Sequence, residues 1–243
     1  MSHLYIEKYN PKSIDQLSYN ERNSNLIQKI STTSDFSHLI FYGPEGAGKK
    51  TRIKILLQSI FNESVHKMKT EVKQFKINST NVEYTISHSA FHIEITPSDS
   101  GNHDRHIVQN VIKETASTKI QNLGVKMPTN TTKHNNKVIV IHEADNLSKE
   151  AQSSLRRTME KYSGNCRIIL CCNQISKIIL PIRSRCLSIR VPSPSTSDMI
   201  NSLKVIRDEE KIKINENQIK KITNESCKNL RMAINMMQIS KFN

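Results

Sequence analysis

The stretch at residues 43–51 constrains the fold of this chain more than any other part of the sequence. It reads "GPEGAGKKT", in which Gly43, Gly48 and Lys49 match the pattern G-x-x-x-x-G-K. Glycines at these positions let the backbone wrap around phosphate oxygens, and the N–H groups at the start of a following helix can bind the same phosphates. An apolar run at 38–42 precedes the loop, and apolar residues at helical spacing follow it at 51–61. Strand, glycine loop and helix therefore come in the order that a phosphate-binding site requires.

The residue after the loop lysine departs from the usual pattern. Lys50 stands where such loops normally carry a serine or threonine whose hydroxyl binds magnesium. Sliding the pattern by one residue, so that Thr51 supplies the hydroxyl, fails because Pro44 and Lys49 would then fall on the two glycine positions. Lys49 is therefore the predicted phosphate lysine, and the magnesium hydroxyl is absent from its normal place.

Short apolar runs alternate with amphipathic stretches up to about residue 190, which is typical of a parallel sheet flanked by helices. We expect an α/β fold with further strands at 71–77, 81–88, 91–95, 138–141 and 167–172, the first two forming a hairpin, helices at 105–117 and 149–162, and a surface loop at 124–136. Proline and serine concentrate at 190–198, where the pattern changes to helices alone. We place a domain boundary there, between an α/β nucleotide-binding domain at 1–191 and an all-helical lid at 192–243. In the lid, Ser195 and Asp198 predict a capping box, and helices are expected at 216–225 and 229–239.

Charge and cysteine content bear on the partners and the compartment. The formal net charge of +14 suits a partner with phosphates, although a general bias toward lysine explains it equally well. Five cysteines without C-x-x-C pairs argue against a secreted disulfide framework and a structural zinc site, and favour reduced thiols in the cytosol or nucleus. No apolar run approaches the ~20 residues of a membrane span, so no membrane partner is expected.

A second motif follows the strand expected at 138–141. The string "VIVIHEAD" places His142 where a metal-binding carboxylate is usual, and Glu143 comes next. Neutral imidazole is a poor ligand for Mg²⁺, which prefers carboxylate and water oxygens. His142 alone is as well read as an ordinary surface histidine, but with Lys50 it means that two magnesium contacts are altered in one site. Glu143 can still orient or deprotonate a water, and a base without a well-held metal should be a slow catalyst.

Three further strings carry a family resemblance. Residues 5–11, "YIEKYNP", are similar to the box W-x-E-K-Y-R-P, with Tyr5 for tryptophan and Asn10 for arginine, while "LRRTMEKY" at 155–162 and "IRSRC" at 182–186 are close to further signatures. The chain resembles, over essentially its whole length, a small subunit of the eukaryotic clamp loader replication factor C, within the AAA+ P-loop NTPases. The string "GAGKKTR" and the missing strand-end aspartate resemble the small subunit whose nucleotide site is degenerate.

The resemblance implies a site for ATP or ADP in which Mg²⁺ binds weakly or not at all. Tyr9 and Pro11 would lie against the adenine, Asn173 matches the first sensor residue and Arg231 the second. Taken without the family, these residues are better interpreted as packing, turn and solvated helix residues. The phosphates would contact the loop residues Gly43, Pro44, Glu45, Gly46, Ala47, Gly48, Lys49, Lys50 and Thr51.

The resemblance also implies an assembly. Arg185 would reach into a neighbouring subunit's nucleotide and support catalysis in trans, the alternative being an exposed basic cluster with Arg183 and Arg190. Arg105, near a helix start, is the candidate DNA contact. The implied partners are the other subunits of a hetero-pentamer, the sliding clamp and primer–template DNA in the nucleus, in replication and repair. A collar domain follows the lid in the family, and we expect it to be absent from this chain because the sequence stops at Asn243.

Function therefore has one favoured interpretation and three alternatives. We expect a clamp-loader subunit with a weakly active or inactive site of its own. A self-sufficient AAA+ ATPase would need the metal contacts that Lys50 and His142 deny, and a pure scaffold has no reason to retain Lys49, Asn173 and Arg231 together. A subunit of an alternative, checkpoint-type clamp loader stays compatible with the sequence.

Overall fold

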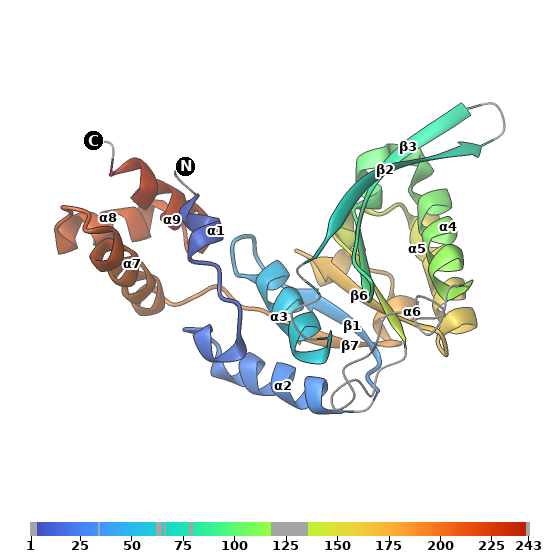
Figure 1. Ribbon diagram of the computed structural model, residues 1–243, viewed down its shortest axis with the longest axis horizontal. Helices are drawn as coiled ribbons and strands as arrows, with labels where there is room; N and C mark the ends of the chain where they lie inside the picture. Colours follow the sequence, from blue (N-terminus) through green and yellow to red (C-terminus); the bar gives the residue numbers. More distant parts are fainter. Residues whose placement is uncertain are drawn as a thin grey trace.

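A seven-stranded sheet forms the centre of the protein in the computed structural model, which describes residues 4–33, 35–61, 65, 67–77, 80–117 and 136–241. The strand order is β2-β3-β4-β5-β6-β1-β7 (Figure 1). Strands β4, β5, β6, β1 and β7 run parallel, while β2 and β3 add an antiparallel hairpin at one edge. The expected α/β architecture is thus confirmed. The strands are β1 His38–Tyr42, β2 Lys69–Ile77, β3 Thr80–His88, β4 His92–Ile95, β5 Lys137–Ile141, β6 Cys166–Cys172 and β7 Cys186–Arg190.

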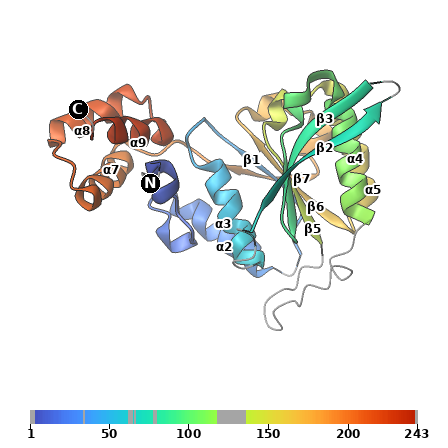
Figure 2. The same ribbon diagram turned by 45° about the horizontal axis from the view of Figure 1, so that its top comes forward.

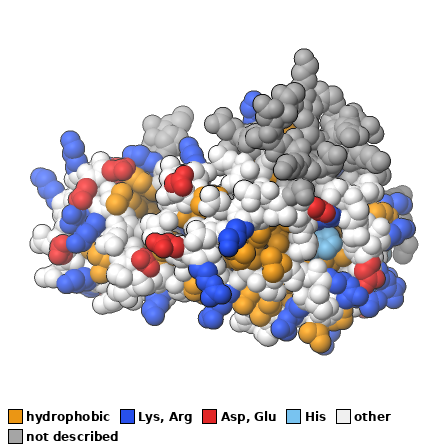
Figure 3. All heavy atoms as spheres, turned by 90° about the horizontal axis from the view of Figure 1, so that it is seen from below, with side chains coloured by type: hydrophobic (Ala, Val, Ile, Leu, Met, Phe, Trp, Pro, Cys, Tyr) orange, Lys and Arg blue, Asp and Glu red, His pale blue; other side chains and the backbone are white. Residues whose placement is uncertain are grey.

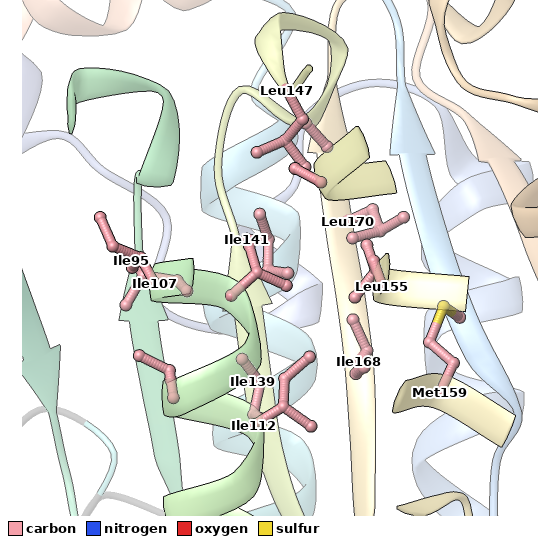
Figure 4. Close-up of a cluster of buried hydrophobic side chains, with 14 of the residues drawn as sticks. Ile95, Ile107, Ile112, Ile139, Ile141, Leu147, Leu155, Met159, Ile168 and Leu170 are labelled. Atoms are coloured by element: carbon pink, nitrogen blue, oxygen red, sulfur yellow. The ribbon is translucent and has the colours of Figure 1, made fainter. Parts of the chain in front are cut away.

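Helices cover both faces of the parallel strands, which explains why β5 and β6 are almost wholly apolar. Helices α4 (Asp104–Ser117) and α5 (Lys149–Tyr162) cover one face, and α2 (Glu21–Thr32) and α3 (Lys49–Phe61) cover the other (Figure 2). Side chains alternate between the two cores, so that Ile139 of β5 packs with α4 and α5 while Val138 packs on the opposite side. Figure 4 shows isoleucines and leucines of β4, β5 and β6 meeting side chains of α4 and α5.

A separate bundle of three helices, called the lid below, stands beside the sheet (Figure 1). It contains α7 (Thr196–Glu210), α8 (Glu216–Glu225) and α9 (Leu230–Ile239), and the capping box of Ser195 and Asp198 at the start of α7 is confirmed. The short helix α1 (Tyr5–Lys8) also packs here, with Tyr5 only 5% exposed in the lid core. A boundary at residue 191 would leave α1 with the α/β part, so in this respect the packing differs from the expectation. The Tyr5 ring of α1 is buried against the helices of the lid.

Several elements were not expected from the sequence. They are α1, α2, β7, α6 (Leu180–Arg183) and the 3₁₀ turns Ile14–Gln16, Pro97–His103, Ala144–Asn146 and Ile175–Lys177. The turn of the hairpin at 78–79 and nearly all of the expected loop at 124–136 lie outside the described residues. In the ranges given above, no helix is both long and apolar enough to cross a membrane. Each of the five cysteines is a free thiol.

Candidate nucleotide-binding site

The glycine loop lies between β1 and α3, at the carboxyl end of the parallel strands. Glu143 follows β5 and Asn173 follows β6 at the same edge, because parallel strands all end there. Ligands of open α/β sheets bind outside this edge. Two adjoining cavities open there, one beside the loop lysine and one between the loop and the lid.

The loop glycines are required by the backbone and by the neighbours that crowd it. Gly46 and Gly48 have φ values of 69° and 75°, in the left-handed region that glycine favours. A Cβ on Gly46 would stand 1.9 Å from Oδ1 of Asn229 in the lid, and one on Gly48 would stand 2.8 Å from Oη of Tyr19. Ala47 is buried beneath the loop, where its carbonyl accepts a hydrogen bond from Tyr19 Oη at 3.0 Å. The loop is a preformed cradle whose shape tolerates only glycine at these two positions.

Lys49 points back into the cradle. Its ammonium donates to the carbonyls of Gly43 and Pro44 at 2.7 and 2.8 Å and to Oδ1 of Asn173 at 2.8 Å. Burial lowers the pKa of Lys49, while Cys171, Cys172 and the nearby carboxylates oppose that shift. Asn173 also donates to Oε1 of Glu45 at 3.3 Å. The predicted phosphate lysine and the predicted first sensor are therefore in direct contact, although 124 residues separate them.

The cavity beside Lys49 has a volume of about 190 Å³ and brings most of the predicted phosphate-side residues together. Its wall includes Glu45, Gly46, Gly48, Lys49, Lys50, Glu143, Asn173 and Arg231. Glu143 adopts a left-handed backbone, with φ of 52°, and its carboxylate accepts a hydrogen bond from Asn146 at 3.1 Å. A left-handed backbone on a residue other than glycine is uncommon and clusters at functional sites.

The second cavity, of about 370 Å³, is mostly apolar and opens between the loop and the lid. Tyr9, Pro11 and Thr51 line it, together with the lid side chains Val205, Ile206, Leu230 and Ile234. Gly46, Gly48 and Arg231 belong to both cavities, which makes them two compartments of one site. A flat apolar group fits the lid side and phosphates fit the loop side.

The position of the missing metal ligand is occupied by an ion pair that the sequence did not reveal. Nε2 of His142 lies 2.9 Å from Oε2 of Glu94 on β4, and Nε2 of His92 lies 3.5 Å from the other carboxylate oxygen. Burial opposes the charge on Glu94, but the hydrogen bond with His142 and the nearby ring of His92 hold the pKa of its carboxyl well below the usual range. His142 does not line either compartment of the site.

The two positions that usually supply oxygen ligands for Mg²⁺ carry other groups in this chain. Lys50 replaces the hydroxyl, and the ring of His142 is turned to Glu94. Across the part of the chain that the structure describes, no group of three or more His, Cys, Asp or Glu side chains has a geometry suited to a metal ion.

Two features of the site escaped the sequence-based reasoning. The carboxylate of Asp145 accepts the backbone N–H groups of Asn173 and Gln174 at 3.1 and 3.2 Å, and its Oδ1 atom is buried without a hydrogen-bond partner among the described residues. Arg52, fully buried, donates to the carbonyls of Ala47 and Tyr19 at 3.2 and 3.0 Å. Asp145 stands two residues after Glu143 in "HEAD", which was the available signal. Nothing local marks an arginine on an otherwise amphipathic helix as buried.

Two predicted residues lie away from both compartments. The guanidinium of Arg185 contacts Glu160 at 2.6 Å and donates to the carbonyl of Pro181 at 2.8 Å. Arg105 is exposed at the start of α4 and lies 3.7 Å from Glu150. Neither position contradicts a role toward another molecule.

The parallel sheet order, the glycine loop after β1 and the helical lid define a P-loop NTPase of the AAA+ type. The same fold occurs in the RuvB Holliday junction branch migration motor of Thermotoga maritima, with a TM-score of 0.64 at 13% identity over 95% of this chain and 64% of that one. A family model described as "DNA polymerase III, delta subunit" matches residues 19–195.

Sequence relatives narrow the class to one family. The chain is 42% identical to replication factor C subunit 5 of Saccharomyces cerevisiae, over 99% of its own length and 68% of that protein. It is 39% identical to replication factor C subunit 3 of Homo sapiens, over 97% and 64% of the two lengths. The chain belongs to the replication factor C small-subunit family of clamp loaders, on the branch named subunit 3 or subunit 5, and it spans about two thirds of the length of these relatives.

Proposed function

We propose that this chain acts as a clamp-loader subunit that holds adenine nucleotide at a degenerate site and hydrolyses it poorly. The base would occupy the compartment beside Tyr9 and Pro11, and the phosphates would bind the glycine loop and Lys49 in place of the carbonyl contacts that the lysine makes here. Glu143 would act as a general base, but hydrolysis would be slow because no metal ion is held firmly beside it. The one observation that carries the proposal is the pairing of His142 with Glu94 beside an intact cradle.

The subunit would contribute to catalysis at a neighbour's site. Arg185 would supply positive charge to the phosphates of that neighbour's nucleotide, because a trans arginine stabilises charge that develops in phosphoryl transfer. The names of the relatives support assembly with other replication factor C subunits. In that assembly the chain would help to open a sliding clamp and load it on primer–template DNA in the nucleus. Arg105 is the proposed contact with the DNA backbone.

Titration with fluorescent ADP and ATP, with magnesium and with EDTA, tests the proposal. We expect binding that changes little between the two conditions and negligible turnover by the isolated chain, because the hydroxyl and the strand-end carboxylate are missing. Lys49→Met is the control and should abolish binding by removing the phosphate cation. Brisk magnesium-dependent hydrolysis by the isolated chain would instead favour a self-sufficient ATPase.

A further inference from the structure

Two consecutive residues of the N-terminal segment are bonded to opposite sides of the base compartment. Tyr9 donates its hydroxyl to Oε1 of Glu210 at 2.9 Å, and Glu210 is the last residue of α7 in the lid. Oδ1 of Asn10 accepts a hydrogen bond at 3.1 Å from Thr51, in the first turn of α3 behind the phosphate loop. The segment is therefore a strap that joins the lid to the nucleotide loop.

Glu210 holds the lid end of this strap. Besides Tyr9, its carboxylate binds Tyr5 Oη at 3.0 Å, Lys8 Nζ at 2.5 Å and Lys241 Nζ at 2.9 Å, and its side chain is only 10% exposed. These partners come from both ends of the described chain. Hydrogen bonds from Lys8, Lys241 and Tyr9 lower the pKa of Glu210 to about 2, so the carboxylate is charged throughout the physiological range.

The strap and Glu210 surround the base compartment rather than a remote surface. Tyr9 and Asn10 line that compartment, and so do Val205 and Ile206, which precede Glu210 on α7. A ring seated there would touch the strap and the lid at the same time. The position of the Tyr9 ring depends on Glu210, because the phenol donates its hydroxyl to that carboxylate at 2.9 Å.

We infer that Glu210 is a positioning residue for the base. It fixes Tyr9 against the compartment and keeps the strap on the lid. Binding of a base is thereby coupled to the closed position of the lid over the loop. The inference rests on the proposed function, in which an adenine nucleotide binds here. Among the described residues, the hydrogen-bond and ion-pair partners of Glu210 all lie on the strap and the lid side, so its effect should be confined to ligands that carry a base.

The test compares ADP with inorganic tripolyphosphate, which carries phosphates and no base. Glu210→Ala and Tyr9→Phe are the test variants, and Glu216→Ala is the matched control, because Glu216 also pairs with a lysine, Lys204, at 2.6 Å but entirely within the lid. We expect Tyr9→Phe to weaken ADP binding by roughly ten-fold or more, the effect of losing about one hydrogen bond to a charged group. Glu210→Ala removes that bond and the contacts with Tyr5, Lys8 and Lys241, and should weaken ADP binding at least as much. Tripolyphosphate affinity should stay within about two-fold of wild type, and the double variant should be no weaker than Glu210→Ala alone.

The outcomes separate the inference from the proposed function. If wild type binds ADP and both test variants bind it equally well, the inference is wrong. Equal losses for ADP and tripolyphosphate would also overturn it, since they would mean general damage rather than base positioning. Tyr9→Phe removes a single hydroxyl, so it decides the matter if Glu210→Ala fails to fold. If wild type binds tripolyphosphate but shows no preference for ADP, the proposed adenine site itself fails.

Discussion

Lys50 and His142 stand at the two positions where a metal ligand is usual, and each changes its surroundings by a different physical effect. Lys50 adds a cation where the loop usually presents a neutral hydroxyl, next to the lysine that already faces the phosphates. His142 hydrogen-bonds Glu94, a carboxylate with only 13% of its side chain exposed, and so favours its ionised form. A nearly buried carboxylate needs a partner to stay charged. The histidine thus removes one oxygen ligand and at the same time stabilises another carboxylate in its ionised form.

Restoring the two usual residues should therefore restore a metal site at a cost in stability. The double variant Lys50→Thr, His142→Asp gains a hydroxyl and one carboxylate, the latter at the position that now pairs with Glu94. We expect it to bind nucleotide more tightly with magnesium than with EDTA. In EDTA the like charges should lower the free energy of unfolding by roughly 3 kcal/mol, the effect of breaking a buried pair. Calorimetric titration and denaturant unfolding measure the two effects. The single variant Lys50→Thr keeps the His142–Glu94 pair and should lose no stability. If magnesium does not change nucleotide binding by the double variant, the expectation is wrong.

Site residues that belong to one short motif could be predicted from the sequence. Site residues whose partners are distant in the sequence could not. Gly43, Gly48 and Lys49 stand in one short string, so their pattern predicted the cradle that the structure contains. Glu210 meets Tyr9 from 201 positions away, and no local pattern distinguishes it from the exposed Glu209 beside it. Glu94 was missed for the same reason, because its partner His142 follows another strand, β5.

Among the elements, β1 carries the loop and is itself anchored by its first residue. His38 accepts a hydrogen bond from the backbone N–H of Ile168 on β6 at 3.0 Å. Burial and the charge of Arg167 lower the pKa of His38 to about 4, although a hydrogen bond to the Met159 carbonyl and the charge of Asp35 oppose the shift. The neutral ring thus ties two central strands to the end of α5, on the side of the sheet opposite the site.

This anchor should make stability depend on pH in the acid range. The folded pKa lies below the ordinary value near 6.5, so the unfolded chain binds the proton first and the contribution of His38 is lost as the pH falls from about 6.5 toward 4. Between pH 7.5 and pH 5 we expect it to remove about 2 kcal/mol from the free energy of unfolding of wild type. Urea unfolding at both pH values measures the loss, which should shrink in His38→Gln. The exposed His106 serves as a control, since His106→Gln should leave the loss unchanged; an equal loss in His38→Gln would assign it to other groups.

Elements whose apolar residues recur at regular spacing were the ones that sequence periodicity predicted well. The strands β5 and β6 and the helices α4 and α5 fall within a residue of their expected bounds, since their apolar spacing is regular. The edge strand β7, with Leu187 and Ser188 exposed, carries no such run. Helix α2 begins at a left-handed Asn20 without a side-chain cap, so its start has no local signal either.

Over the whole molecule, the distribution of charge is a weaker guide to partner surfaces than the position of one exposed arginine. Lys and Arg side chains are spread from the lid to the α/β part on the face in Figure 3, with acidic side chains among them rather than in a separate region. On that face the net charge of +14 therefore marks no single DNA-binding stripe. Arg185 is more specific, because it stands on an exposed turn before β7 with its guanidinium already oriented by Glu160 and the Pro181 carbonyl.

A trans role for Arg185 predicts a loss that appears only in the assembled complex. Arg185→Ala should leave ADP binding by this chain unchanged, since the residue lies outside both compartments, and should depress turnover at the neighbouring site by about 10³-fold or more. Single-turnover hydrolysis by a complex reconstituted from its subunits measures that site.

Arg183→Ala removes a charge two residues away and should retain most of the activity. Glu160→Gln frees the guanidinium from its 2.6 Å ion pair and should lower turnover far less than Arg185→Ala, because the cation itself remains. If the Arg185→Ala complex turns over at the wild-type rate, Arg185 has no trans role and is better interpreted as part of an exposed basic cluster with Arg183 and Arg190.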